Sequence, residues 1–273
     1  MGKRITNFVM AASVAFGANF AGLASADEFA HRTNFTVKFA GLEIGKATFN
    51  IEFDDTSYSL KGSGKTSGLV EWISPSTGEV SSAGALIENQ LKPEKHSVSV
   101  IENKKKPESI ELAFAEEKVV DIDIQSNKKP KVRKAPKYVP VEAQHLAAVL
   151  DPASTLLVPM SGVDARDGNK VCNQRFPVFD GETRYDIRLR YKATKPIDTK
   201  GYKGHAYVCQ LRYIPVAGHK KNHRNVKEMA ENKNMEIWLA PMQGVSVFTP
   251  IRILIGTKYG RFAAEPTYFG SAS

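Results

Sequence analysis

The chain has 273 residues, of which 42% are hydrophobic and 25% charged, and its formal net charge is +9. These proportions are ordinary for a globular protein and suit one large domain or two small ones. After the N-terminal segment, no run approaches the roughly 18 apolar residues that a membrane-spanning helix requires, which excludes a helical membrane protein.

The first residues have the order of a secretory signal peptide. Two cations, Lys3 and Arg4, precede a mostly apolar stretch that ends at an A-x-A cleavage site formed by Ala24 and Ala26. The alternatives are a transmembrane anchor or an ordinary N-terminal helix, and both are disfavoured because the apolar run is interrupted and ends at a cleavage site. No Cys lies near this site, which argues against a lipid-anchored protein.

This leader sets the expected domain organisation and compartment. We expect residues 1–26 to be removed and residues 27–273 to form a single β-rich domain in the bacterial periplasm, with a basic loop at residues 127–140. Export separates the protein from nucleic acid, so the positive charge does not predict a nucleic-acid partner.

Apolar and polar residues alternate along most of the mature chain. Each alternating segment has one apolar and one polar face, which is typical of an antiparallel sheet with one side on a core. The sequence therefore predicts a mainly β fold, either a large curved antiparallel sheet or an incomplete β-barrel, wrapping two or three short helices. The predicted strands lie at or near residues 35–39, 49–53, 110–114, 120–124, 185–191, 205–213, 235–239, 245–255 and 262–269.

The segment from Gly62 to Thr66 reads Gly-Ser-Gly-Lys-Thr, which superficially matches a phosphate-binding loop. Ser59 stands where that pattern requires its first Gly. We therefore interpret the segment as a flexible turn.

A run of cations follows the predicted strand at 120–124, and prolines within the run prevent a regular helix. A like-charged run is usually a solvated loop, and the alternative is contact with an anionic envelope surface. A second basic cluster at residues 219–224 supports that alternative. The residues proposed for this contact are Lys128, Lys129, Lys131, Arg133, Lys134 and Lys137.

Helix is predicted in three short segments. Residues 141–150 are rich in helix formers. Asp151 and Pro152 predict an N-cap and a first helical residue for a second helix over residues 153–158. A third helix is predicted over residues 225–232.

The mature chain has two cysteines, Cys172 and Cys209. An exported protein meets an oxidising compartment, and the alternation around Cys209 points its side chain to the apolar face of a strand. We expect a structural disulfide that stabilises the fold by about 4 kcal/mol. Redox or metal-binding thiols are the alternative, which the absence of a C-x-x-C motif disfavours.

Candidate chemistry elsewhere is weak, so the sequence predicts no catalytic residue, cofactor or metal. Residues 164–169 lack the spacing of a calcium loop. His219 and His223 lie four residues apart, but Gly218 and nearby lysines argue against an ordered metal site. Ser154 stands outside any G-x-S-x-G motif.

The second half carries several short motifs in a characteristic order. They are Asp151-Pro-x-Ser154, Val178-Phe-Asp-Gly181 leading into Arg184-Tyr-Asp-Ile187, Glu236-Ile-Trp238, and a closing strand pair through Pro250-Ile-Arg252 and Gly260. In this the chain resembles an uncharacterised exported Gram-negative family, the domain of unknown function 3108. More distantly, the expected sheet is similar to the curved sheets of lipoprotein-carrier proteins. That similarity implies a concave apolar face for acyl chains.

The favoured hypothesis is a non-enzymatic envelope protein. Its concave face would hold a lipid, another hydrophobic ligand or a partner peptide, and an anionic surface or another envelope protein could be a partner. The candidate lining residues are Tyr185, Ile187, Leu189, Tyr191, Tyr207, Leu211 and Tyr213, for which core packing is the simpler interpretation.

Two alternatives remain. A hydrolase or other enzyme acting on envelope substrates would place His145 or His205 beside a buried carboxylate. A transmembrane β-barrel is disfavoured because the polar strand faces carry Lys, Arg and Asp.

Overall fold

The computed structural model describes residues 29–54, 56–103, 105–127 and 136–272. The predicted signal peptide, with Ala24 and Ala26, lies outside the described residues. So do Lys128, Lys129, Lys131, Arg133 and Lys134 of the basic run.

One antiparallel sheet of 14 strands dominates the described chain. Its first half comprises β1 (Phe29–Phe39), β2 (Leu42–Phe53), β3 (Ser57–Thr66), β4 (Ser76–Ile87), β5 (Gln90–Glu102), β6 (Glu108–Ala115) and β7 (Lys118–Gln125). Its second half comprises β8 (Val158–Pro159), β9 (Arg175–Phe179), β10 (Arg184–Thr199), β11 (Tyr202–Ala217), β12 (Met235–Pro241), β13 (Val247–Thr257) and β14 (Gly260–Ser271). The prediction of a large curved antiparallel sheet is confirmed.

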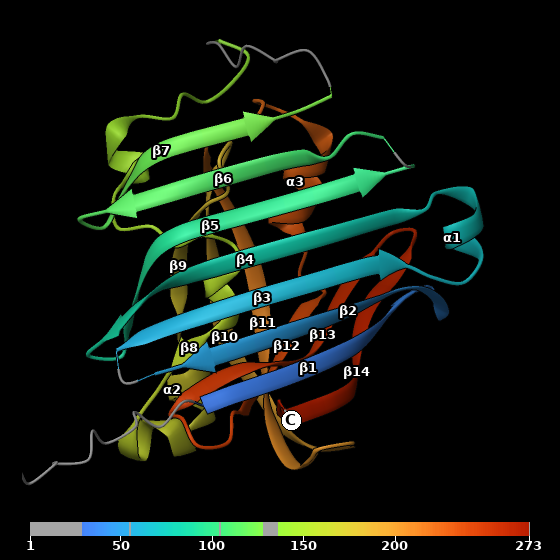
Figure 1. Ribbon diagram of the computed structural model, residues 1–273, viewed down its shortest axis with the longest axis vertical. Helices are drawn as coiled ribbons and strands as arrows, with labels where there is room; N and C mark the ends of the chain where they lie inside the picture. Colours follow the sequence, from blue (N-terminus) through green and yellow to red (C-terminus); the bar gives the residue numbers. More distant parts are fainter. Residues whose placement is uncertain (1–28, 55, 104, 128–135, 273) are drawn as a thin grey trace, which may run out of the picture.

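Two meanders meet in the middle of this sheet. The strand order is β7-β6-β5-β4-β3-β2-β1-β14-β13-β12-β11-β10-β9, and the short β8 pairs with β13. The first and last strands therefore join the halves through their β1–β14 pairing. Figure 1 shows β1–β7 across the front of the molecule, with the strands of the second half running steeply behind them.

The apolar faces of the two halves face one another and form the core. Tyr58 and Leu60 of β3 share a buried cluster with Val247 of β13, and Leu112 of β6 shares another with Phe179 of β9. These contacts join segments far apart in sequence, so the sheet curls upon itself as an incomplete barrel.

A short extended segment bridges the two edge strands at one end of the barrel. Ala147 forms a β-bridge with Lys118 of β7, and Leu150 forms one with Val178 of β9. Between them, the N–H of Ala148 donates to the carbonyl of Glu117 at 2.8 Å. The sheet is thus tied across its edges at this end, which we call the bridged end.

Helices are short and lie between strands. They are α1 (Leu69–Ile73), α2 (Gly168–Cys172) and α3 (Arg224–Glu231), with 3-10 turns η1 (Ala143–Leu146), η2 (Ser154–Leu156) and η3 (Gly162–Arg166). The predicted helix at residues 225–232 is confirmed by α3.

The helix predicted over residues 141–150 is wrong. Only η1 is helical there, because the backbone of residues 147–150 is recruited to β7 and β9. The helix predicted over 153–158 shrinks to η2, because Val158 pairs with Phe248 of β13.

The interpretation of residues 62–66 as a turn is also wrong, since they lie inside β3. The glycine there serves packing rather than flexibility. A Cβ on Gly62 would lie 2.7 Å from both the Phe49 ring and Val80, whose side chains fill the space above it.

A pair of substitutions on β3 tests this packing. We expect Gly62→Ala to lower the free energy of unfolding by about 1–3 kcal/mol, because the new methyl overfills the core. Gly64→Ala is the matched control, since its Cβ would lie 3.6 Å from the nearest atom, the Lys46 carbonyl oxygen. Urea unfolding of both variants provides the measurement, and equal destabilisation would contradict the explanation.

Candidate functional site

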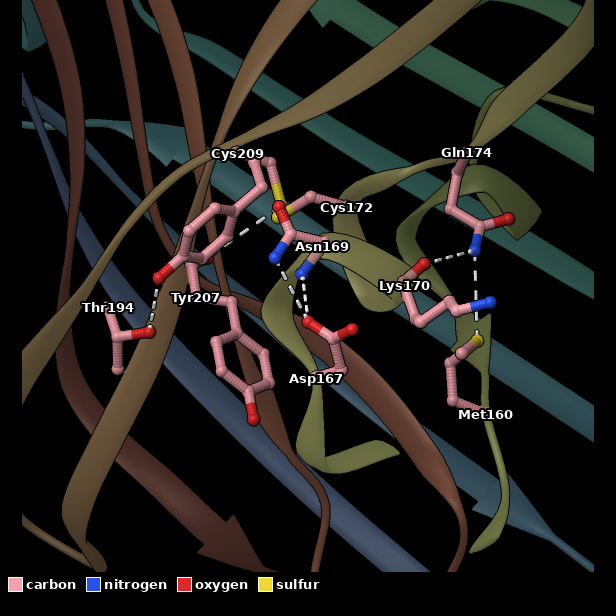
Figure 2. Close-up of a disulfide and its surroundings, with 10 residues drawn as sticks. Met160, Asp167, Asn169, Lys170, Cys172, Gln174, Thr194, Tyr207 and Cys209 are labelled. Atoms are coloured by element: carbon pink, nitrogen blue, oxygen red, sulfur yellow. Dashed lines mark hydrogen bonds between the residues drawn. A yellow bond between two sulfur atoms is a disulfide. The ribbon is translucent and has the colours of Figure 1, made fainter. Parts of the chain in front are cut away.

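The two cysteines form a disulfide between α2 and β11. Figure 2 shows Cys172 reaching Cys209, with Tyr207 on the same strand beside them. Asp167 caps α2 by accepting a 2.8 Å hydrogen bond from the Asn169 N–H. Both sulfur atoms belong to the core, because each cysteine is fully buried.

The predicted ligand face surrounds this disulfide and is mostly filled. Leu189 belongs to the buried cluster, and Tyr185, Ile187, Tyr207 and Leu211 pack against it. Tyr213 contacts Tyr185, with ring centroids 5.0 Å apart, whereas Tyr191 is 38% exposed. These residues therefore serve mainly as core, and α2 and β8 cover them.

One member of the predicted anionic-surface contact, Lys137, is described and exposed. Its carbonyl accepts a 2.9 Å hydrogen bond from the N–H of Lys221, and Tyr138 forms a β-bridge with Lys220. The structure thus brings Lys137 beside the second basic cluster at residues 219–224.

A buried polar network lies between η2 and the first half of the sheet. Asp151 is its centre: its Oδ2 accepts hydrogen bonds from Ser154 Oγ at 2.5 Å and Ser82 Oγ at 2.8 Å. His96 Nδ1 lies 3.0 Å from Asp151 Oδ1, and Tyr58 bonds Ser154 Oγ at 2.7 Å. All five side chains are at most 4% exposed.

Asp151 also holds the turn that leads into η2, although the N-cap of η2 is Ala153 and not the predicted Asp151. Its Oδ1 accepts hydrogen bonds from the N–H groups of Ala153 and Ser154, both at 2.9 Å. Burial alone raises the pKa of the Asp151 carboxyl, but the contacts with His96 and Ser154 outweigh it and lower that pKa below its usual value.

This network resembles a catalytic triad in composition but differs in connectivity. Ser154 gives its single hydroxyl proton to Asp151, whereas nucleophile activation requires the Ser hydroxyl to donate to a His. Asp151 and Ser154 also have no exposed surface. The arrangement fits a structural role, in which the buried hydrogen bonds hold residues 151–154 against the sheet.

The end of the barrel away from the bridging segment contains a cavity of about 510 Å³. We call this the open end. Four aliphatic side chains line the cavity, Val98 and Val100 from β5, Ile110 from β6 and Ile124 from β7, and polar residues make up the rest of the lining. A volume of this size is typical of small-molecule sites.

A second, shallow hollow of about 330 Å³ adjoins the first, and Val100 lines both. It crosses strands β1–β4, where small residues share one face of the sheet, including Gly45, Ala47, Gly64 and Gly78. Because no large side chain stands at these positions, the two hollows form a shallow groove along the concave face, which we call the channel.

Polar residues surround the mouth of the larger cavity. Lys105 and Lys106 come from the β5–β6 turn, Glu102 and Glu108 from the adjoining strand ends, and Glu182 from the β9–β10 turn. The second half of the sheet thus contributes to the rim. A cavity with aliphatic side chains and a charged rim can hold an amphiphilic molecule.

Sequence reasoning missed both the network and the cavity. His145 and His205 were the predicted histidines, but His96 is the one beside a buried carboxylate. The available signal for the channel was the alternation of Gly62 and Gly64 along an apolar strand, which indicates open space or close packing on one face.

Two features are absent from the described part of the chain, a membrane-spanning helix and a metal-binding cluster. Within residues 29–272, apart from the undescribed gaps, no helix is long and apolar enough to cross a bilayer. In the same part of the chain, no cluster of three or more His, Cys, Asp or Glu side chains could hold a metal ion.

Comparison with known proteins identifies a family and a fold. The family model described as protein of unknown function (DUF3108) matches residues 34–266. A crystal structure of a β-barrel-like protein of domain of unknown function DUF1849 from Brucella abortus has a TM-score of 0.50 at 7% identity, covering 90% of this chain and 98% of that one. This similarity concerns fold alone. No curated protein matches the chain.

The disulfide is expected to contribute substantially to stability. Replacing Cys172 and Cys209 together with Ser removes a crosslink between residues 37 apart and should lower the free energy of unfolding by about 4 kcal/mol. Guanidinium unfolding with and without a reductant measures the effect. The reductant should destabilise the natural protein and leave the double variant unchanged; a natural protein insensitive to reduction would contradict the expectation.

The buried carboxylate predicts an acid-sensitive fold. Because the folded pKa of Asp151 lies below its unfolded value near 4, its stabilisation is present above about pH 4 and is lost as the pH falls through the folded pKa. Asp151→Asn should reduce stability at neutral pH by about 3–5 kcal/mol and flatten this acid dependence.

Unfolding measured between pH 2 and 7 tests this expectation, with the exposed Asp123→Asn as control. Burial lowers the pKa of His31 to about 4. The free energy of unfolding of every variant therefore also falls as the pH is lowered from about 6.5 to about 4. Identical pH profiles for Asp151→Asn and the natural protein would contradict the role of Asp151.

Proposed function

Since the chain belongs to the DUF3108 family of proteins of unknown function, we propose a function from its own geometry: it binds an amphiphilic lipid whose acyl chain lies on the concave face. The observation that carries this proposal is the pair of adjoining hollows at the open end, which share the aliphatic side chain of Val100. The fold supplies the space because the bridging segment and η2 fill only the bridged end.

The lining combines aliphatic side chains inside the cavity with charged side chains at its mouth, as an amphiphilic ligand requires. Val98, Val100, Ile110 and Ile124 provide apolar surface for hydrocarbon, and transfer of apolar surface out of water drives binding. At the mouth, lysine and glutamate side chains supply donors and acceptors for a polar head group. Small-molecule sites commonly combine apolar side chains with polar groups that orient the ligand.

We further propose that the protein acts in the periplasm without catalysing a reaction. The predicted leader supports the compartment. The disulfide fits an oxidising environment. A hydrolase is the alternative, but the buried network does not favour it, because its serine donates to a carboxylate and is closed to substrate.

Substitution at the junction of the cavities tests ligand binding. Val100 lines both cavities, so Val100→Trp should block them and raise the Kd for a fluorescent fatty acid by about tenfold or more. The neighbouring Ile101 is 39% exposed, and its side chain points to the opposite face of β5. Ile101→Trp is therefore the matched control and should leave the Kd unchanged.

Fluorescence titration of the protein purified from periplasm, after delipidation, provides the measurement. Failure of the natural protein to bind the fatty acid, or equal binding by Val100→Trp, would contradict the proposal. Displacement of the fatty acid by a peptide but not by phospholipid would favour a partner peptide instead.

A further inference from the structure

Large apolar side chains are exposed at or beside three turns at the open end of the sheet. One begins β2 directly after the β1–β2 turn, three are on α1 between β3 and β4, and one is on the β13–β14 turn. They are Leu42 (68% exposed), Leu69 (76%), Trp72 (90%), Ile73 (81%) and Tyr259 (75%), and we call them the rim patch.

The strand register places these turns together. Thr66, at the end of β3, pairs with Gly45 near the start of β2, and the N–H of Ser67 donates to the carbonyl of Ile44 at 3.1 Å. The N–H of Ala40, in the β1–β2 turn, donates to the carbonyl of Arg261 beside the β13–β14 turn at 3.0 Å. Figure 1 shows α1 and the β1–β2 and β13–β14 turns on the same side of the molecule.

Cations lie among these turns. The N–H of Asn103 donates to the carbonyl of Pro75 at 2.8 Å, which sets the exposed Lys105 and Lys106 beside the loop that carries α1. Lys65 is exposed at the end of β3. Carboxylates are present as well: Glu71 is on α1, and Glu102, Glu108 and Glu182 line the mouth of the larger cavity. Glu43 is engaged by Ser67 at 2.7 Å and Lys46 at 3.9 Å.

The rim patch also flanks the cavity mouth. Ile44, Thr66 and Ser76 line the smaller cavity, and these residues directly border Leu42 and the loop that carries α1. Lys105 and Lys106 line the larger cavity. Exposed apolar groups, cations and the entrance to the channel therefore share one end of the molecule.

We propose that the rim patch docks the protein onto an anionic phospholipid bilayer, with the cavity mouth facing the membrane. Trp and Tyr favour the membrane interface, Leu and Ile favour the acyl boundary, and lysines are attracted to anionic head groups. The rim patch is made of separate apolar side chains with lysines among them, and it has no single continuous apolar surface. Such an arrangement suits a bilayer, because lipids can move laterally to meet each side chain. The purpose of docking, exchange of a lipid with the bilayer, rests on the proposed function, whereas the docking itself has its own evidence.

Vesicle co-sedimentation of the mature protein tests the proposal. Vesicles of phosphatidylglycerol and phosphatidylethanolamine, at about one to three, should sediment the natural protein, and added salt should weaken binding. Trp72→Ser combined with Ile73→Ser should weaken binding about tenfold or more. Val163→Ser is the matched control, because Val163 is 82% exposed on η3 near the bridged end and should not contact the membrane.

The fatty-acid titration separates docking from ligand binding. The Trp72, Ile73 double variant should keep its affinity for the fatty acid, and Val100→Trp should keep its affinity for vesicles. Absence of sedimentation by the natural protein, or equal sedimentation of the double variant, would overturn the proposal. A dimer in sedimentation velocity that the double variant abolishes, without vesicle binding, would assign the rim patch to self-association and would also overturn it.

Discussion

The hydrogen-bonded carboxylate of Asp151 is the constraint on which the architecture depends. It receives two hydroxyl and two backbone N–H hydrogen bonds and contacts His96, so its charge is stabilised despite complete burial. Its partners Ser82 and His96 come from β4 and β5, whereas Asp151 itself follows the segment that bridges β7 and β9. One side chain thereby fixes the bridging segment against the inner wall of the sheet.

This attachment makes the two ends of the barrel different. At the bridged end, residues 147–158 and the disulfide-linked α2 occupy the interior and complete the core. At the open end, the concave face instead carries small residues and a few aliphatic side chains, and the two adjoining hollows remain. The same constraint that completes the core at one end thus leaves the channel on which the proposed function depends.

The sequence predicted the parts of the fold that depend on local pattern. Strict alternation located nine of the strands, and the orientation of Cys209 correctly predicted a buried disulfide. Alternation missed β3, β4, β5, β8 and β9, which have no sustained alternation of large apolar side chains with polar ones. Residues 147–150 are extended despite their helix-forming composition, because their backbone pairs with distant edge strands. Asp151 was expected near the start of a helix, but Tyr58, Ser82 and His96 carry no local signal of their role. Their contact with residues 151–154 exists only after the sheet curls.

The candidate site illustrates the same limit. Alternation identified apolar faces in both halves but could not show which face the insert would cover. The predicted residues around Leu189 lie beneath α2 and β8, so they form core. The open channel lies in the other half, where Ala47, Gly64 and Gly78 are aligned across β2, β3 and β4 by strand register. That alignment depends on pairing between strands and not on any single segment.

Native mass spectrometry of the protein, expressed with its predicted leader and purified without detergent, tests the central claim most directly. The account predicts a species heavier than the processed chain by the mass of an acyl lipid, which is released on unfolding. A folded, disulfide-bonded protein that carries no lipid and takes none up when incubated with envelope lipids would contradict it.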